Sequence, residues 1–347
     1  MRQSNALPRA FAALVLLWCL PFGQAFAHWD DGYYHDYDDL PVQSRWMATL
    51  DDTTRLKSIT MPGTHGSAAR HGGWISENQT LTIRQQLAAG IRFLDLRTRH
   101  AGNTLRMQHG HVDQQSNLSH VFDQIEAFLR DHATETVVIR IREEGTPEGN
   151  TRPFAATLDG YFNRYGRMFA TSPWVGSPLG TLRGKVVLFQ DYPGDTRFAE
   201  LQWWGETTRQ DHHHLGTNWD LYDKWERVKG FIDLANRLAN DPYRDLPFVN
   251  FLSGGGGSFP YFVASGHSDP GTGAPGLVTG KVTPFFNDWP DFPRGSCFIG
   301  MCTIFFEGTN TLAKHYLQRR DIRHAGIVAD FPGAGLIDSI IRVNFGR

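Results

Sequence analysis

Cysteine, net charge and long apolar stretches are all scarce in this sequence. Three cysteines occur among 347 residues, too few for a disulfide-held scaffold, so a hydrophobic core must stabilise the fold. The formal net charge is only −2. Nucleic acid is therefore not an expected partner, and any contact with a membrane surface has to be local and transient rather than driven by overall charge.

The one pronounced apolar run lies at the start of the chain. Arg2 and Arg9 give it a positive beginning, residues 11–20 are apolar, and Ala25-Phe26-Ala27 is typical of a signal-peptide cleavage site. The run is shorter than the roughly 20 residues that a membrane span needs. We therefore expect residues 1–27 to be a signal peptide and the protein to be secreted, into the periplasm or out of the cell.

Two of the cysteines, Cys297 and Cys302, enclose the short segment Cys-Phe-Ile-Gly-Met-Cys. In an exported protein such a pair can form a disulfide around a small loop. Two free, buried thiols are the alternative. The surrounding segment 287–308 is aromatic and is expected to be an elaborated surface loop.

From Trp46 onward, short apolar runs alternate with amphipathic stretches, which predicts alternating strands and helices. Several runs are continuously apolar, as in strands that a parallel sheet buries on both faces. This predicts an α/β barrel in one domain, residues 46–347, after a lead-in segment at 28–45. Strands are expected at 58–61, 92–97, 105–108, 136–141, 185–190, 247–251 and 326–329, and helices at 82–89, 118–131, 225–240 and 336–343.

Two histidines and a charged pair lie where a barrel would present them to an active site. His65 follows a Pro-Gly turn at the end of one expected strand, and His109 ends another. Residues just past the C-terminal end of a barrel strand face the site. Asp95 and Arg97 share one face of a third strand, and buried charges of this kind need a partner or a functional role. A structural salt bridge is the alternative interpretation.

Together these clusters resemble the X-type catalytic domain of phosphatidylinositol-specific phospholipases C, of the bacterial, metal-independent type. The resemblance runs from about residue 57 to 343 and implies a distorted (β/α)8 TIM barrel. Its motifs follow in the family's order as SITMPGTHGS, QLAAGIRFLDLR, the His109-Gly110 pair, FLRDHATETVVIRIREE, RGKVVLFQDYPG, LPFVNFLSGGG and AGIVADF.

The resemblance implies a role for each residue of the site. His65 is expected to be the general base that takes the proton from the inositol 2-hydroxyl, which attacks phosphorus and forms a cyclic phosphate. His109 is the expected general acid for the departing diacylglycerol, and an imidazole with a pKa of about 6.5 suits both tasks. Arg97 would stabilise the charge on the phosphate oxygens, Asp330 would orient His65, and Asp95 would support the site.

Arg97 also bears on metal dependence. Calcium-dependent relatives are expected to carry an acidic residue at its position, and a metal-binding Asn where this chain has Gly66. A guanidinium repels a cation and can take over its electrostatic role, so no metal and no cofactor are expected. Metal-independent relatives have an aspartate at the position of Gly66, and Glu144 is the nearest carboxylate that could replace it. The run 212–214 is three histidines, but adjacent side chains cannot all face one ion, so a polar loop is expected.

The expected headgroup residues follow the family only in part. Arg142 stands where a lysine usually contacts inositol, and Asp191 where an arginine contacts the sugar hydroxyls. Asp220 and Tyr222 match the sugar-binding aspartate and the stacking tyrosine. The expected substrate is therefore phosphatidylinositol or an inositol glycolipid, cleaved to diacylglycerol and inositol 1,2-cyclic phosphate. A phosphodiesterase for another headgroup and a catalytically weak lipid- or glycan-binding relative are the alternatives.

Five aromatic residues are further candidates for contact with lipid, namely Trp203, Trp204, Trp289, Phe292 and Phe298. Aromatic side chains favour the interface between a membrane and water. Ordinary core packing explains single aromatic residues equally well. The protein is expected to be a monomer that touches the membrane surface transiently.

Overall fold

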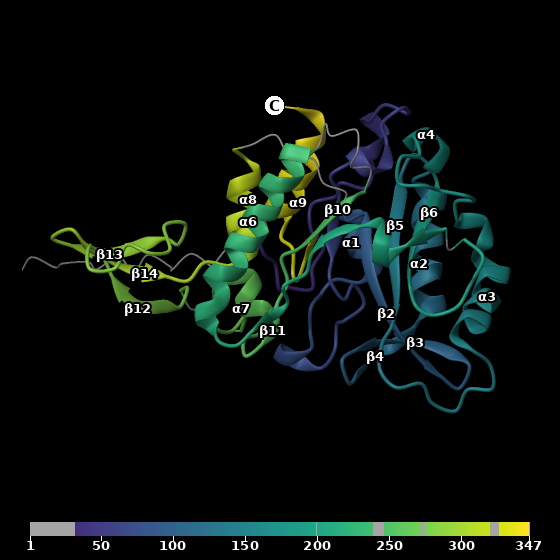
Figure 1. Cartoon of the computed structure of the whole chain (residues 1–347), viewed down its shortest axis with the longest axis horizontal. Coiled ribbons are helices and arrows are strands. Elements are labelled where there is room, and N and C mark those ends of the chain that lie inside the picture. Colours follow the sequence, from purple (N-terminus) through teal and green to yellow (C-terminus); the bar gives the residue numbers. More distant parts are fainter. Residues whose placement is uncertain (1–31, 199, 239–245, 272–274, 320–325, 347) are drawn as a thin grey trace, which may run out of the picture.

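A computed structural model describes residues 32–198, 200–238, 246–271, 275–319 and 326–346 (Figure 1). Eight parallel strands form a curled sheet in the order β7-β6-β5-β2-β1-β15-β10-β8. Neighbours along this path are consecutive barrel strands, and the fifth and sixth, β7 and β8, lie at its two ends. The expected distorted (β/α)8 barrel is thereby confirmed. The strands are β1 Pro62–Thr64, β2 Phe93–Ala101, β5 Thr136–Glu143, β6 Lys185–Asp191, β7 Leu201–Gln202, β8 Thr208–Gln210, β10 Phe248–Phe251 and β15 Gly326–Ala329.

Two further strands extend this sheet by antiparallel pairing, and five other described strands lie outside it. β3 (Thr104–His109) pairs antiparallel with β2, and β4 (Val112–Asn117) pairs with β3. β9 (His214–Leu215) pairs with β11 (Gly255–Gly256). The last three strands form a separate antiparallel sheet in the order β12-β14-β13, with β12 Val278–Val282, β13 Arg294–Phe298 and β14 Met301–Phe305.

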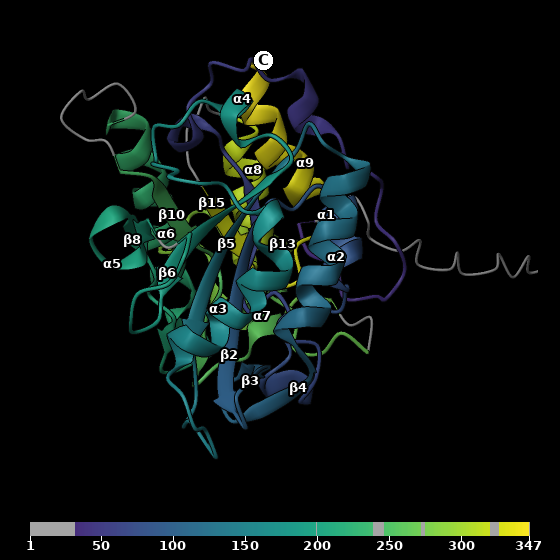
Figure 2. The ribbon, with the colours of Figure 1, turned by 90° about the vertical axis from the view of Figure 1, so that its right-hand side faces the viewer.

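Helices surround the sheet, and α2 and α3 lie outside β2 and β5 (Figure 2). The expected helix at 118–131 is confirmed as α2, because its apolar residues recur along one face and the Asn117 side chain accepts a hydrogen bond from the His120 N–H at its start. The helices are α1 Ile83–Ala88, α2 Leu118–Asp131, α3 Phe154–Tyr165, α4 Leu179–Leu182, α5 Trp203–Glu206, α6 Leu221–Leu238, α7 Pro260–Ser265, α8 Thr309–Leu317 and α9 Ala334–Arg342.

Some element boundaries differ from those expected. The strand predicted at 58–61 is wrong: Leu56–Ser58 is a 3-10 turn, and the first strand pairs with its neighbours only from Pro62. Ile59 and Met61 are fully buried, so the apolar run reflects burial rather than strand pairing. The helix predicted at 225–240 begins earlier, at Leu221, and residues 239–240 lie outside the described part of the chain.

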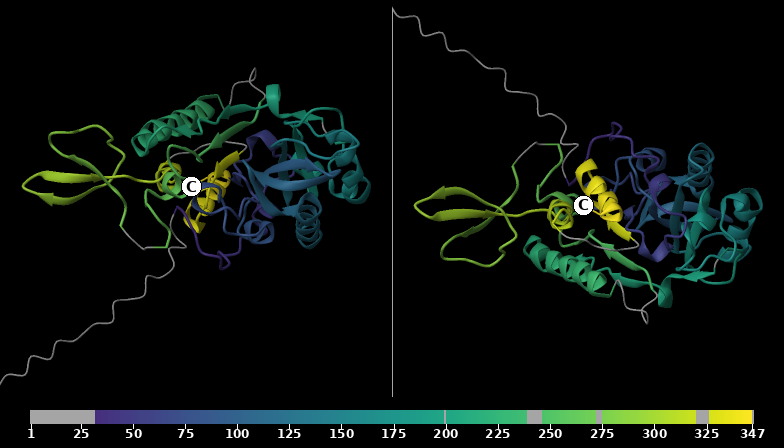
Figure 3. Two further views of the ribbon diagram at one scale, coloured as in Figure 1. Left: turned by 90° about the horizontal axis from the view of Figure 1, so that it is seen from below. Right: turned by 90° about the horizontal axis from the view of Figure 1, so that it is seen from above.

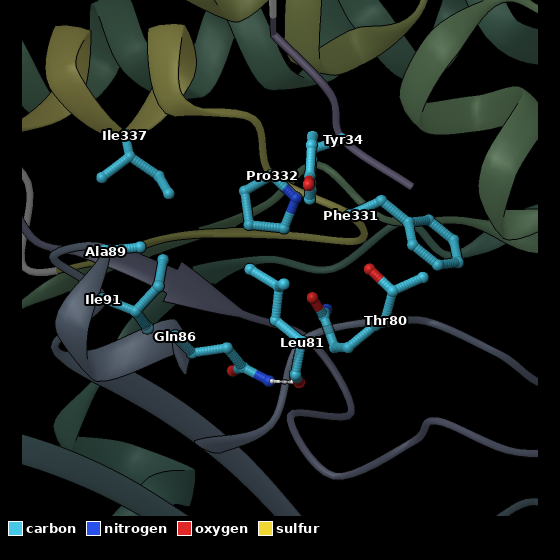
Figure 4. A pocket seen from close by; sticks show the side chains of 10 residues that line it. Tyr34, Thr80, Leu81, Gln86, Ala89, Ile91, Phe331, Pro332 and Ile337 are labelled. Carbon is cyan, nitrogen blue, oxygen red and sulfur yellow. Dashed lines mark hydrogen bonds between the residues drawn. The ribbon is translucent and has the colours of Figure 1, made fainter. Parts of the chain in front are cut away.

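The structure describes the N-terminal part of the chain only from residue 32 onward. The expected signal peptide, residues 1–27, lies outside the described residues, and no described helix is long and apolar enough to cross a bilayer. From Tyr33 the lead-in segment packs on the loop after β15, where His35 contacts Phe331. Beneath it lies a cavity of about 10 Å³, room for at most one water molecule (Figure 4). This cavity is therefore not a substrate site.

The small β12-β14-β13 sheet projects sideways from the barrel (Figures 1 and 3). We call residues 278–305 the arm. Of the two alternatives for Cys297 and Cys302, the structure has the disulfide, near the end of the arm. The base of the arm packs into the protein through Phe292 and Ile304, which are 2% and 0% exposed.

The structure separates the five aromatic candidates for lipid contact. Trp203 is 1% exposed and its ring contacts Phe93 and Phe251, so it belongs to the core, as does Phe292. Core packing, the alternative left open for these residues, therefore holds for both, with Phe292 packed against Tyr222 and Phe306. Trp289 is partly buried beside Phe292. Trp204 and Phe298 are exposed, at 67% and 71%.

Candidate active site

His65 and Asp330 meet at the C-terminal ends of two neighbouring strands. β1 and β15 pair in register, with Thr64 opposite Ala329. His65, which follows β1, therefore lies beside Asp330, which follows β15. The His65 N–H of the backbone donates to the Ala329 carbonyl at 3.0 Å. In the side chains, Nδ1 of His65 lies 2.7 Å from Oδ1 of Asp330. The structure thus brings together the histidine and the carboxylate that the sequence singled out.

Arg97 reaches the same histidine from β2. Its Nη2 lies 2.7 Å from His65 Nε2, and its Nε donates to Asp95 Oδ2 at 3.1 Å. Its Nη1 forms an ion pair with Glu144 Oε2 at 3.3 Å. A guanidinium is a donor only, so it fixes one orientation relative to all three partners. The side chains of His65 and Arg97 are each 13% exposed, so this face of the cluster opens to solvent.

His109 approaches from the antiparallel hairpin β2–β3 rather than from a barrel strand. β3 doubles back along β2, with Met107 opposite Thr98, and ends at His109. The ring centroids of His65 and His109 are 5.7 Å apart and the ring planes are nearly perpendicular, at 86°. The two histidine rings therefore meet edge to face, with Arg97 bonded to His65 beside them.

Burial and positive charge favour the neutral form of both histidines. Desolvation, followed by the charge of Arg97, lowers the pKa of His65 to about 3. Desolvation, followed by the charges of His65 and Arg97, lowers the pKa of His109 to about 4. A neutral imidazole is the form that a general base requires.

The position of the proton on His65 follows from its partners. Burial raises the pKa of Asp330 to about 8, whereas it lowers the pKa of His65, so a proton is contested between the two groups. Arg97 determines which nitrogen of His65 carries the hydrogen, because the N–H of Arg97 can only donate to a lone pair on Nε2. Nδ1 then carries the hydrogen and donates it to the Asp330 carboxylate. His65 is thus held in the tautomer whose Nε2 lone pair faces Arg97 and the site.

Buried charges around Asp95 keep Arg97 in place. Burial by itself raises the pKa of Asp95, but the charges of Arg97 and Arg140 outweigh it and hold that pKa well below its usual range. Burial lowers the pKa of Arg97, and the opposing charges of Asp95 and Glu144 raise it above its ordinary value. Arg97 is thus a permanent cation at the centre of the site.

Glu144 occupies the supporting position that the sequence left open at Gly66. Its carboxylate pairs with Arg97 and accepts a hydrogen bond from the N–H of Gly110, the residue after His109. Gly66 itself has a φ of +47°, and a Cβ there would lie 2.9 Å from Asn78 Oδ1. A side chain at this position is therefore strained, and the carboxylate next to Arg97 comes from the end of β5 instead.

Asp191 is committed to a partner that sequence reasoning missed. Arg140, 1% exposed, donates from Nε to Asp191 Oδ2 at 3.0 Å and from Nη1 to Asp95 Oδ1 at 3.1 Å. The Trp204 indole N–H also donates to Asp191. Arg142, half-buried, stands between Arg97 and Asp191 in the register of β2, β5 and β6. Through their ion pairs, Arg97, Asp95, Arg140 and Asp191 thus form a series of alternating charges.

Asp220 and Tyr222 lie at the start of α6, away from the histidine contacts just described. Asp220 accepts a hydrogen bond from the Thr217 N–H at 2.9 Å. Tyr222 is 8% exposed, and its ring packs against Phe292 at 5.0 Å. Little of that ring is left for stacking on a sugar.

Asp211 is, after Arg140, a second charged residue near the site that sequence reasoning missed. It follows β8 directly, and its charge acts on both His65 and Arg97. The strand before it reads Thr-Arg-Gln, so no apolar run marked it as a strand. The usable signal was its position, because an acid after a barrel strand faces the site.

Metal ligands do not gather around the cluster. In the described ranges, no three histidine, cysteine, aspartate or glutamate side chains are placed to hold a metal ion. Asp95 and Glu144, the carboxylates that could otherwise face a cation, are both paired with Arg97.

A curled parallel barrel with two histidines and an arginine at its C-terminal edge defines the class of phospholipase C-like phosphodiesterases. Comparison with known proteins narrows this class. Residues 53–196 match the sequence profile of the PI-PLC X domain. Residues 53–196 are therefore similar to the PI-PLC X-domain family.

Individual relatives agree with this assignment. The 1-phosphatidylinositol phosphodiesterase of Listeria monocytogenes is 31% identical over 159 residues, which are 42% of this chain and 48% of that enzyme. The protein of the same name from Staphylococcus aureus (strain Newman) is 27% identical over 66% of this chain and 82% of its own length.

Solved structures show the same fold. Phosphatidylinositol-specific phospholipase C from Listeria monocytogenes superposes with a TM-score of 0.62 and 20% identity, over 87% of this chain and 98% of its own. The Staphylococcus aureus enzyme, in a structure that concerns its membrane binding, gives a TM-score of 0.59 at 23% identity, over 87% of this chain and 99% of its own.

Proposed function

We propose that this protein is an exported phosphodiesterase that cleaves phosphatidylinositol, or an inositol glycolipid, into diacylglycerol and inositol 1,2-cyclic phosphate. The observation that carries the proposal is the Arg97 guanidinium bonded to His65 Nε2, with the His109 ring lying edge to face against the His65 ring. The names of the Listeria and Staphylococcus relatives support phosphatidylinositol as the substrate class.

In this mechanism the substrate takes the place of one contact of Arg97. The inositol 2-hydroxyl hydrogen-bonds to His65 Nε2, and the guanidinium turns to the non-bridging phosphate oxygens. His65 accepts the hydroxyl proton as the oxygen–phosphorus bond forms. The bond from phosphorus to the glycerol oxygen breaks, and the His109 imidazolium gives its proton to that oxygen. Asp330 stabilises the charge that develops on His65.

The remaining charged groups position these three. Glu144 and Asp95 hold the guanidinium from two sides, and the Gly110 contact ties Glu144 to the turn after His109. Asp211, which follows β8, and Arg142, near the end of β5, are two charged groups at strand ends where a headgroup would bind. No metal or cofactor enters any of these steps.

The experiment that tests this function uses purified protein and vesicles that contain phosphatidylinositol. Release of inositol 1,2-cyclic phosphate, followed by phosphorus NMR, is the expected result. The His65→Ala variant is the negative control. Release of inositol 1-phosphate with no cyclic intermediate would contradict the attack by the 2-hydroxyl.

A second candidate, cleavage of a different headgroup, is favoured by one observation. Asp191 is bound by Arg140 and Trp204, so a carboxylate stands where an arginine was expected to meet the sugar. A set of phospholipids with other headgroups, assayed beside phosphatidylinositol at equal concentration, separates the two. Faster cleavage of a headgroup without a neighbouring hydroxyl would favour the second candidate.

Chelation of divalent cations should leave the activity unchanged, because Arg97 supplies the positive charge at the phosphate. The measurement is the initial rate on phosphatidylinositol with and without an excess of EGTA. Loss of activity that added calcium restores would show that a cation is required.

kcat/KM should be highest at acid pH, between about 3 and about 4. His65 works only when neutral, and its pKa of about 3 in the free protein makes kcat/KM fall below that pH. His109 works only when protonated, and its pKa of about 4 makes kcat/KM fall about tenfold per pH unit above that value. A bound phosphodiester adds negative charge beside His109, so kcat should decline at a higher pH than kcat/KM.

Both constants are measured on detergent-dispersed phosphatidylinositol, with circular dichroism at each pH to verify folding. A basic limb of kcat/KM at or above about pH 6.5, the ordinary histidine value, would contradict the role of burial at His109.

A further inference from the structure

The arm, residues 278–305, interrupts the connection from β10 to α8. Connections that follow a barrel strand leave the barrel at the edge where the site lies. The arm therefore departs from the same edge as His65, and it projects well clear of the helices (Figures 1 and 3). Only the base of the arm, through Phe292 and Ile304, contributes to the hydrophobic core.

The outer part of the arm exposes large apolar side chains. Phe285 is 82% exposed, Phe298 is 71% exposed and Ile299 is 84% exposed, and their neighbours Val278, Val282 and Met301 are exposed as well. In the described part of the chain, no other stretch of similar length exposes as many. Apolar surface gathered in this way on an exported protein marks an interaction site.

The end of the arm is a closed and rigid turn. The Cys297–Cys302 disulfide spans it, and Phe298 pairs with Met301 across the turn. Ile299 and Gly300 both have positive φ, 45° and 77°. Because the disulfide joins the two strands, Phe298 and Ile299 stay at the end of the arm, which lowers the ordering cost of binding.

The charges of the arm fit a lipid surface. Between Phe292 and Phe306 the only charged residue is Arg294, and Lys281 adds a second positive charge on β12. Two acidic residues, Asp288 and Asp291, lie in the connection between β12 and β13; Asp288 is exposed, and Asp291 pairs with Lys229 at 2.6 Å. No carboxylate in the outer strands would be repelled by anionic headgroups.

We propose that the end of the arm, Phe298 and Ile299 together with Phe285, inserts into the boundary between headgroups and acyl chains of a lipid bilayer. The arm then anchors the barrel at the surface that holds its substrate. This deepens the proposed function, on which the choice of a membrane as partner rests. A second copy of the chain fits less well, because a stable dimer buries about 800 Å² per partner and three side chains on a narrow finger offer less.

The test measures partition onto sucrose-loaded vesicles of phosphatidylcholine, with and without phosphatidylinositol, in the His65→Ala background so that no lipid is consumed. The double variant Phe298→Ser/Ile299→Ser should bind roughly 100-fold more weakly, from the transfer free energy of two large apolar side chains. The double variant Phe298→Trp/Ile299→Leu should retain binding. Val42→Ser/Phe345→Ser is the matched control, because both residues are exposed apolar side chains outside the arm.

Unchanged partition of the serine variant would overturn the proposal. So would a dimer, seen by light scattering, that the serine variant dissociates, because the surface would then be a contact between copies. Circular dichroism verifies folding of each variant.

A failure of the arm and a failure of the enzymatic function are distinguished by a water-soluble inositol phosphodiester. With His65 intact, wild type and serine variant should cleave it at the same rate. Cleavage with unchanged vesicle partition refutes the arm alone, and lost partition without any cleavage refutes the function alone.

Discussion

Replacing either histidine, by His65→Ala or His109→Ala, should reduce turnover of phosphatidylinositol by about 10²- to 10⁴-fold. Each change removes one proton transfer, and a positioned acid or base contributes about this factor. The losses should not add in the double variant, because the two groups act in one concerted step. The measurement is the initial rate of cyclic phosphate formation by each single variant and by the double variant.

His111→Ala provides the control for these variants. His111 is exposed and lies two residues from His109, so its removal should leave the rate unchanged. A wild-type rate in either active-site variant would remove that histidine from the mechanism. Binding to vesicles should be unaffected in all of them, since the arm is intact.

Arg97→Lys should lower kcat by about 10²- to 10³-fold although the charge is kept. A lysine cannot reach His65, Asp95 and Glu144 together as the guanidinium does, at 2.7, 3.1 and 3.3 Å. The loss should appear mainly in kcat rather than KM, because the arginine acts most strongly on charge that develops in the transition state. Steady-state kinetics on dispersed phosphatidylinositol separate the two constants.

The matched control is Arg99→Lys, two residues along the same strand. Arg99 pairs with Glu148 at a partly exposed position, and the exchange should change the rate less than twofold. A kcat for Arg97→Lys within threefold of wild type would mean that a point charge suffices at this position.

Prediction from the sequence succeeded where local pattern decides structure. α2 and β15 were placed at their observed residues, because the periodicity of one and the continuous apolar run of the other leave little choice. β8 was missed, because three polar residues become a strand only through pairing with β10. Asp211, which follows this strand, was missed for the same reason.

The sequence by itself identified His65, His109, Arg97, Asp95 and Asp330 as the group around which a site would form. It also indicated a barrel and a disulfide between Cys297 and Cys302. These follow from short motifs and from apolar patterns that are written along the chain.

Only the tertiary structure decided how the charges are paired. Glu144 reaches Arg97 from another strand, and Arg140 binds both Asp95 and Asp191 across three strands. It also decided that Trp203 is core whereas Phe298 is exposed at the end of the arm. The physical reason is that burial and ion pairing depend on which strands become neighbours and in what register, and residues far apart in the chain settle this only when the sheet closes around them.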